Sequence, residues 1–85
     1  MRRSGFGANA LYVNGRIFAM LSSRNQLVFK LPADRVRALT SLRVGARFDA
    51  GRGRLMREWL VLRKTSWQQA QALALEAFEF VRTTQ

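Results

Sequence analysis

The sequence predicts an α+β domain of two layers, in which a five-stranded antiparallel sheet carries helices on one face. Three observations lead to this fold. Five short segments are rich in β-branched, aromatic and other apolar residues, and glycine or polar turns separate most of them. Two longer segments, near 32–42 and 66–82, repeat apolar residues every three or four positions, which is the period of a helix. The resulting order is β-β-β-α-β-β-α, and neighbouring strands that end in a helix are typical of antiparallel sheets.

The first two strands are joined by Asn14-Gly15, which favours a type I′ turn because both turn residues need positive φ. We expect these strands at about 8–13 and 16–22. Strict alternation gives the second strand two apolar faces, with Phe18 and Met20 on one and Ile17, Ala19 and Leu21 on the other. A strand of this kind is usually central and covered on both sides.

A third strand is expected at 26–30, and Pro32 follows it. Proline fits the first turn of a helix, where its missing N–H is not needed. The apolar positions of this helix are Val36, Leu39 and Leu42. We expect the helix to end near Leu42, with Gly45 as a stop.

The second half of the chain predicts a hairpin followed by a helix. Strands at 46–49 and 57–63 are joined through the glycine-containing turn at 51–53. In the second of these strands, Trp59 and Val61 share a face.

Ser66 and Gln69 form a capping box for a helix that runs to about Arg82. Its apolar stripe consists of Ala70, Leu73, Ala74, Ala77, Phe78 and Val81. We expect both tryptophans, Trp59 and Trp67, to be core anchors.

Eighty-five residues make one small domain, and the apolar fraction of 48% is that of a folded protein. We treat 1–85 as a single domain whose residues 1–7 form a flexible basic arm. The chain has no cysteine and no histidine, which excludes disulfides and removes the usual general base near neutral pH. It shows neither an apolar run of the roughly 18 residues that a membrane span needs nor a signal-peptide pattern. We therefore expect a cytoplasmic protein with no membrane contact, cofactor or metal.

Fifteen basic and five acidic side chains give a formal net charge of +10. A field of this size attracts polyanions such as nucleic acids. Thirteen of the fifteen bases are arginine, so the same charge is also consistent with a soluble surface in an arginine-preferring proteome. Both interpretations stay open.

A series of short pieces runs in order through the chain: Phe6-Gly7, the hairpin from Leu11 to Ala19, the strand and helix entry from Gln26 to Pro32, and the stretch from Phe48 to Trp59. Together they resemble the TfoX N-terminal domain family. The resemblance covers nearly the whole chain, and none of its motifs is catalytic. It implies a two-layer fold of the YjbR and secretion-chaperone-like kind.

The same resemblance implies a role related to bacterial natural competence and to transcriptional co-activation. Family members usually have a helix before the first strand, and full-length competence regulators carry a second, C-terminal helical domain. This sequence ends at Gln85 without the second domain, and the helix before the first strand is either absent or was lost to a late start. We therefore expect the fold to carry over first and the regulator class second.

The loop that contains Arg52, Arg54 and Arg57 is a candidate anion or partner contact. Glycines let backbone N–H groups approach an anion, and arginine donates two parallel hydrogen bonds to phosphate or carboxylate. The spacing is not that of a Walker loop or a dinucleotide fingerprint. The alternative is a solvated hairpin in which Arg54 or Arg57 pairs with Asp49 or Glu58.

Tyr12, Phe18 and Phe29 lie on neighbouring predicted strands. They form either a stacking platform for RNA or part of a core or interface, and the second interpretation is favoured because aromatic residues dominate cores.

A catalytic role finds little support in the sequence. Asp49 and Glu58 flank the glycine loop, but arginines close to both favour structural ion pairs over acid/base chemistry. Lys30 and Lys64 are the remaining bases for a nucleophile, and neither lies in a motif. We predict that the protein is not an enzyme, and a hydrolase or metal-dependent enzyme ranks last.

The second strand leads to the interface prediction. If helices cover one sheet face only and the first helix is missing, Phe18 and Met20, or their neighbours on the opposite face, lack a cover. An exposed apolar patch on a small protein usually becomes an interface. We expect a homodimer or a partner protein over these two residues. The alternative is that the amino-terminal arm and the two helices cover the sheet.

The predicted function is a non-enzymatic, TfoX-like interaction domain that acts as a transcription- or competence-related regulator. Its contacts would be the three loop arginines together with Phe18 and Met20. The alternative is a basic nucleic-acid-binding module, in which Arg2, Arg3 and the same loop arginines contact phosphates.

Overall fold

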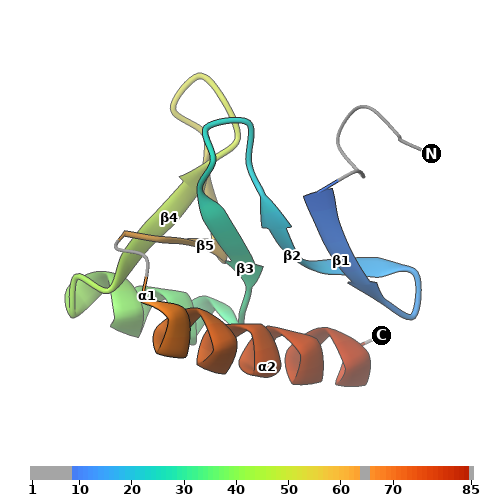
Figure 1. Cartoon of the computed structure of the whole chain (residues 1–85). Helices are drawn as coiled ribbons and strands as arrows, with labels where there is room; N and C mark the ends of the chain where they lie inside the picture. The colour runs from blue at the N-terminus through green and yellow to red at the C-terminus, as the bar shows by residue number, and fades with distance from the viewer. Residues whose placement is uncertain (1–8, 64–65, 85) are drawn as a thin grey trace.

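The computed structural model describes residues 9–63 and 66–84. In them the chain forms a five-stranded antiparallel sheet with two helices packed beneath it, as Figure 1 shows. The elements are β1 (Ala10–Val13), β2 (Arg16–Leu21), β3 (Leu27–Lys30), α1 (Ala33–Ser41), β4 (Gly45–Asp49), β5 (Leu55–Leu62) and α2 (Trp67–Thr83). The predicted α+β fold and its element order are confirmed. The predicted arm, residues 1–7, lies outside the described residues.

The strands lie side by side in the order β1-β2-β3-β5-β4. Every neighbouring pair is antiparallel. After β3 the chain passes through α1 to the edge strand β4 and returns as β5, which pairs with β3. The sheet therefore has β1 and β4 at its edges. Because β5 pairs with both β3 and β4, it joins the first three strands and the β4–β5 hairpin into one layer.

The turn between β1 and β2 has the predicted geometry. Asn14 has a φ of 53° and Gly15 a φ of 76°, and a type I′ turn needs positive values at both positions. Asparagine adopts this region more readily than most residues other than glycine. This local signal therefore sets the first strand pairing.

A bulge in β2 changes which of its side chains share a face. The pairing of β2 with β1 skips Phe18, which is an extra residue in the strand. As a result Phe18 and Ala19 both belong to the core on the helix side, whereas Ile17 and Met20 lie on the opposite side. The prediction from strict alternation that Phe18 and Met20 share a face is wrong.

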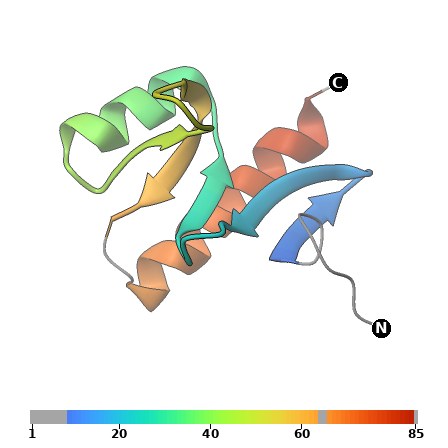
Figure 2. The ribbon, with the colours of Figure 1, turned by 90° about the horizontal axis from the view of Figure 1, so that it is seen from above.

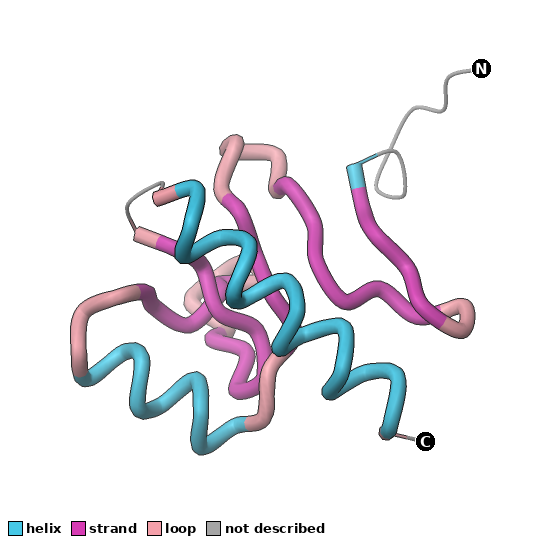
Figure 3. Tube along the Cα trace, turned by 60° about the horizontal axis from the view of Figure 1, so that its bottom comes forward, coloured by secondary structure: helices cyan, strands magenta, loops and turns pink. Residues whose placement is uncertain are grey.

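The main core lies between the sheet and the helices. Leu31, Val36 and Leu60 are fully buried there. Helix α2 packs across β2 and β3 while α1 packs on β4 and β5, and Figure 3 shows both helices on the same side of the sheet. Phe18 meets Phe78 of α2 edge to face, with ring centroids 5.5 Å apart.

Helix α1 ends at Ser41, with Leu42 as its C-cap, so the predicted end near Leu42 is confirmed, but the residues at this end differ from the prediction. The left-handed residue after it is Arg43, with a φ of 62°, and Leu42 is 70% exposed instead of buried. Gly45 already belongs to β4, and a Cβ on it would lie 2.5 Å from the carbonyl oxygen of Val61. Gly45 therefore permits the close approach of β4 to β5, and the prediction that it stops the helix is wrong.

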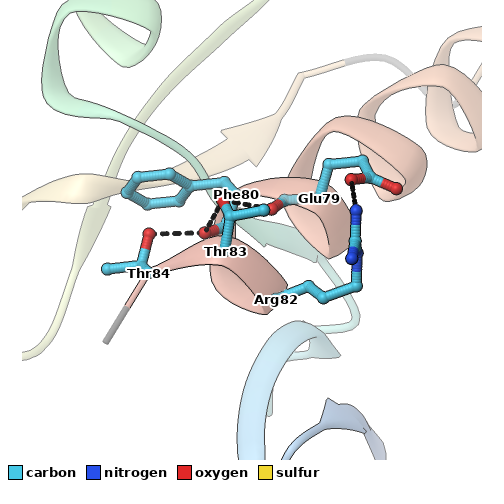
Figure 4. Close-up of polar contacts among 5 residues, drawn as sticks. All are labelled: Glu79, Phe80, Arg82, Thr83 and Thr84. Atoms are coloured by element: carbon cyan, nitrogen blue, oxygen red, sulfur yellow. Dashed lines mark hydrogen bonds and ion pairs between the residues drawn. The ribbon is translucent and has the colours of Figure 1, made fainter.

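Helix α2 begins with the predicted cap, because the Ser66 hydroxyl accepts a hydrogen bond from the Gln69 N–H at 3.3 Å. Its buried residues are Ala70, Leu73, Ala77 and Val81, as predicted. Figure 4 shows its last turn, where hydroxyl groups donate to backbone carbonyls, from Thr83 to Glu79 and from Thr84 to Phe80. Trp67 is 70% exposed, so the prediction that it anchors the core is wrong.

Candidate functional site

The sheet face opposite the helices carries an apolar cluster of its own. Met20, Val28 and Val61, from three adjacent strands, are buried in it. Partly buried side chains surround them: Ala10, Ile17, Phe48 and Trp59. Neither α1 nor α2 contributes a residue to this cluster, and in Figure 2 this face turns toward the viewer with α2 behind it. We call this side of the sheet the open face.

A groove crosses the open face between the β2–β3 turn and the end of the β4–β5 hairpin. Its volume is about 810 Å³. The apolar part of its lining includes Met20, Phe48 and Val61. Polar residues on its two sides include Ser22 and Arg24 from the turn and Asp49 from the hairpin. Figure 1 shows both loops rising on the side of the sheet away from the helices.

The β4–β5 hairpin reaches the groove because β5 contains residues that β4 does not pair. Arg47 pairs with Leu60, but the next residue, Phe48, pairs with Met56, which leaves 57–59 without partners on β4. An unequal count of residues bends the longer strand. Phe48 packs against the open-face cluster in this arrangement.

Lys30 and Trp59 lie opposite each other on β3 and β5. The Lys30 Nζ is 5.0 Å from the centroid of the Trp59 ring and 3.2 Å from Oε1 of Glu58. Lys30 therefore already has an anionic and an aromatic partner. Glu58 pairs with Lys30 and not with Arg54 or Arg57, so that part of the solvated-hairpin alternative is wrong.

The loop that carries Arg52 and Arg54 has backbone angles that glycine adopts easily. Gly51, Arg52 and Gly53 have φ values of 119°, 57° and 74° in succession. Asp49 Oδ1 accepts a hydrogen bond from the Gly51 N–H at 2.8 Å, and the Ala50 N–H donates to the carbonyl of residue 54 at 2.9 Å. Asp49 thus stabilises the loop backbone and forms no ion pair with an arginine of the described chain.

The structure places Arg52 and Arg54 on this loop, whereas Arg57 lies on the part of β5 that β4 does not pair. All three are exposed, and none forms an ion pair with another described residue. Arg2 and Arg3, the other predicted phosphate contacts, lie outside the described residues. The described arginines are therefore available to an anionic partner.

The acidic side chains of the described residues do little to neutralise the positive charge of Arg52, Arg54 and Arg57. Two of the three ion pairs among the described residues lie on the helices, Arg35 with Glu76 and Arg82 with Glu79. The hydrogen bond from Arg35 to Glu76 raises the pKa of Arg35, and the Coulomb attraction of Glu76 adds to the effect, while burial opposes it. Arg47 also lines the groove, and its Nε is buried without a hydrogen-bond partner among the described residues.

The described residues offer no group for catalysis by a metal ion, because no three acidic side chains lie close enough together to hold one. Asp49 and Glu58 are engaged with the Gly51 N–H and with Lys30, respectively. In the described part of the chain, neither helix has the length and apolar character that crossing a membrane requires. Among the residues that the structure describes, we find no catalytic constellation beside the groove.

The aromatic residues that we considered for stacking divide between the two faces. Phe18 and Phe29 belong to the core beneath the sheet, as favoured, whereas Tyr12 is 50% exposed and pairs with Ile17 on the open face. Sequence reasoning missed Phe48 and Arg24 as groove residues. The apolar alternation of Ala46 with Phe48 is the one local signal that would have placed Phe48 on the open face.

Comparison with known proteins gives no further support for or against these assignments. No protein-family description, curated protein or solved structure matches the chain. The resemblance to the TfoX N-terminal domain family therefore stays a prediction that depends on the residues quoted for it.

Proposed function

We propose that this chain is a non-enzymatic interaction domain that binds a partner protein through the open face of its sheet. The observation that carries the proposal is the apolar cluster of Met20, Val28 and Val61, which no helix of the described chain covers. The groove beside it adds concave apolar surface with polar sides. Around the buried cluster, the partly buried Ile17, Phe48 and Trp59 and the half-exposed Tyr12 leave apolar area on this face. Exposed apolar area on a small protein is typical of a protein–protein contact.

The biological role that we propose is that of a TfoX-like regulator in transcription or competence. Its support is the series of short sequence pieces that resemble the TfoX N-terminal domain family, together with the shared α+β architecture. A regulator of this type acts through contacts with other proteins, which agrees with a binding surface that has no catalytic group beside it.

Of the two predicted interface residues, Met20 lies on the open face and Phe18 does not. Met20 remains a candidate because it lies on the open face, but Phe18 packs beneath the sheet against Phe78. A homodimer over the open face would bring two chains of net charge +10 together, which repulsion disfavours at low salt. We therefore favour a different protein as the partner.

Photo-crosslinking in cells tests this proposal. The crosslinking amino acid p-benzoylphenylalanine replaces Tyr12, which is 50% exposed on the open face, or Trp67, which is 70% exposed on a helix. Both sites are exposed, so neither variant should disturb folding. We expect a discrete protein adduct from the Tyr12 site and none from the Trp67 site. Adducts from Trp67 alone would reject the open face, and an adduct with twice the mass of the chain would indicate a homodimer.

The alternative function, nucleic-acid binding, is favoured by one observation: Arg52, Arg54 and Arg57 are exposed and without ion pairs among the described residues. Phosphate contacts make binding fall steeply with salt. Replacing Arg52 or Arg54 by alanine should lower the salt dependence by about one unit of slope for each phosphate that the variant no longer binds. Fluorescence anisotropy with duplex and single-stranded DNA and with RNA measures this, with Arg37→Ala on α1 as the matched control. Absence of binding at low salt would remove the alternative.

A further inference from the structure

The groove on the open face combines an apolar lining with a basic group, Arg24, on one side. We infer that it binds an acidic segment of a partner protein that carries at least one large apolar anchor residue. This inference rests on the proposed function and adds the chemistry of the partner. Three features support it: the shape of the groove, its apolar lining and the balance of charge around it.

The apolar lining comes from three different strands. Met20 of β2 and Val61 of β5 are 9% and 8% exposed, and Phe48 of β4 is partly buried beside them. A volume of about 810 Å³ falls within the range of clefts that bind ligands. A single leucine or phenylalanine of a partner would therefore find apolar contacts with room for its neighbours in the chain.

The charge of the protein disfavours a basic segment, because the chain has a net charge of +10. Arg24 lines one side of the groove, whereas Arg47 pairs with Leu60 of the core beneath the sheet, which places its side chain on the helix side. Among the described lining residues Asp49 is the one acid, and its Oδ1 already accepts the Gly51 N–H. Carboxylates of a bound segment would gain charge-assisted hydrogen bonds from Arg24. Complementary charge of this kind also speeds association.

The same observations distinguish this partner from the other occupants. A second copy of the chain would bring the same excess of basic groups to the groove. Single-stranded nucleic acid prefers exposed aromatic faces on which bases stack. Here Trp59 already has the Lys30 ammonium over its ring, and the buried centre of the face is Met20, Val28 and Val61. An acidic segment with an apolar anchor agrees best with both the lining and the charge.

Peptide display on the full-length protein tests the inference. Random 12-residue peptides are selected on the immobilised chain, and the most enriched peptide is synthesised and titrated against it by anisotropy. We expect the enriched peptides to be net negative and to contain a leucine, phenylalanine or other large apolar residue. Arg24→Glu should weaken binding by about tenfold, and Phe48→Ala by a similar factor of about ten. Arg37→Glu makes the same charge change on α1 and should alter binding by less than about twofold.

The possible results separate the inference from the proposed function. Enriched peptides that are neutral or basic, but whose binding Phe48→Ala weakens, would overturn the acidic partner and keep the open face as a binding surface. Equal losses from Arg24→Glu and Arg37→Glu would show diffuse attraction and overturn the groove as the site. If no peptide is enriched while a 12-nucleotide poly-dT strand binds, both the inference and the proposed function fail. Arg24 is exposed, so its variant tests the inference even if Phe48→Ala impairs folding.

Discussion

Phe18 and Met20 lie on the same strand and are equally buried, each with 9% of its surface exposed, but on opposite faces of the sheet. Phe18 is covered by a helix that follows it by some sixty residues, through the edge-to-face contact with Phe78. Met20 is covered by side chains of its own sheet, chiefly Val28 and Val61. Equal burial therefore has two different origins in this molecule.

The exposed fraction of a side chain therefore does not by itself separate a core from a binding surface. On the helix side, side chains are buried between two layers, the sheet and the helices. On the open face, burial comes from one curved layer, and a partner can still remove more apolar area from water at about 25 cal/mol per Å². The element that covers a residue decides its role more than its exposure does.

The largest effect that we expect comes from comparing Phe18→Ala with Met20→Ala. Phe18→Ala should lower the free energy of unfolding by about 3–5 kcal/mol, because a closed cavity remains between sheet and helix. Met20→Ala should cost about 2 kcal/mol, because its neighbours can relax toward solvent and no sealed cavity forms. Urea unfolding at neutral pH measures both values.

Met20→Ala and Phe18→Ala should also differ in their effect on partner binding. Met20→Ala should weaken a partner that docks on the open face, whereas Phe18→Ala should leave binding intact under conditions where it is still folded. If the two substitutions cost the same stability and neither affects binding, the open face is a second core and the proposed contact surface is wrong.

Gly45→Ala should have an intermediate effect. The added Cβ would lie 2.5 Å from the Val61 carbonyl oxygen, which is backbone and cannot move without shifting β5. We expect a loss of about 1–3 kcal/mol in the free energy of unfolding. Because β5 carries Leu60 on one face and Val61 on the other, both faces should be affected.

Gly15→Ala is the control for that substitution. Gly15 has a φ of 76° but nothing lies within 4 Å of its added Cβ, so only backbone strain would be felt. We expect a loss of about 1 kcal/mol there. A larger loss at Gly15 than at Gly45 would show that conformational strain, and not the approach of β4 to β5, dominates at these glycines.

The element order could be predicted because each element has a local signal. The Asn14-Gly15 turn and the Ser66 cap are encoded within a few residues, and the structure contains both. The bulge at Phe18 has no such signal. Phe18 is the extra residue in β2, and both it and its neighbour Ala19 are apolar. The apolar pattern of the strand therefore does not reveal that a residue has been inserted. The face assignment of β2 therefore failed although its position was correct.

The candidate site could be predicted only in part. Two apolar faces on β2 indicated that more than one layer of contacts surrounds the sheet, and Met20 does lie on the open face. The groove itself depends on the unpaired residues 57–59 and on a turn from a distant part of the chain, which brings in Arg24. No local sequence pattern predicts that the β2–β3 turn and the β4–β5 hairpin lie on either side of one groove. Their positions follow from the strand order β3-β5-β4.

The smallest effect on stability that we expect comes from the ion pair between α1 and α2, Arg35 with Glu76. This pair lies on the helix side of the sheet, which we call the covered side. Arg35 donates from Nε and from a terminal nitrogen to the two carboxylate oxygens of Glu76, each at 2.9 Å. The two side chains are 42% and 38% exposed, so a double-mutant cycle of Arg35→Gln and Glu76→Gln should give a coupling of about 0.5 kcal/mol. The pKa of Arg35 is raised, so this contribution is fully present below the ordinary pKa of arginine and is lost only as strongly alkaline pH removes the proton. Unfolding at neutral pH therefore measures it in full. Because the pair joins α1 to α2 on the side away from the groove, partner binding should not change. A coupling above about 1.5 kcal/mol, or weaker partner binding in either variant, would show that the covered side and the open face are not independent.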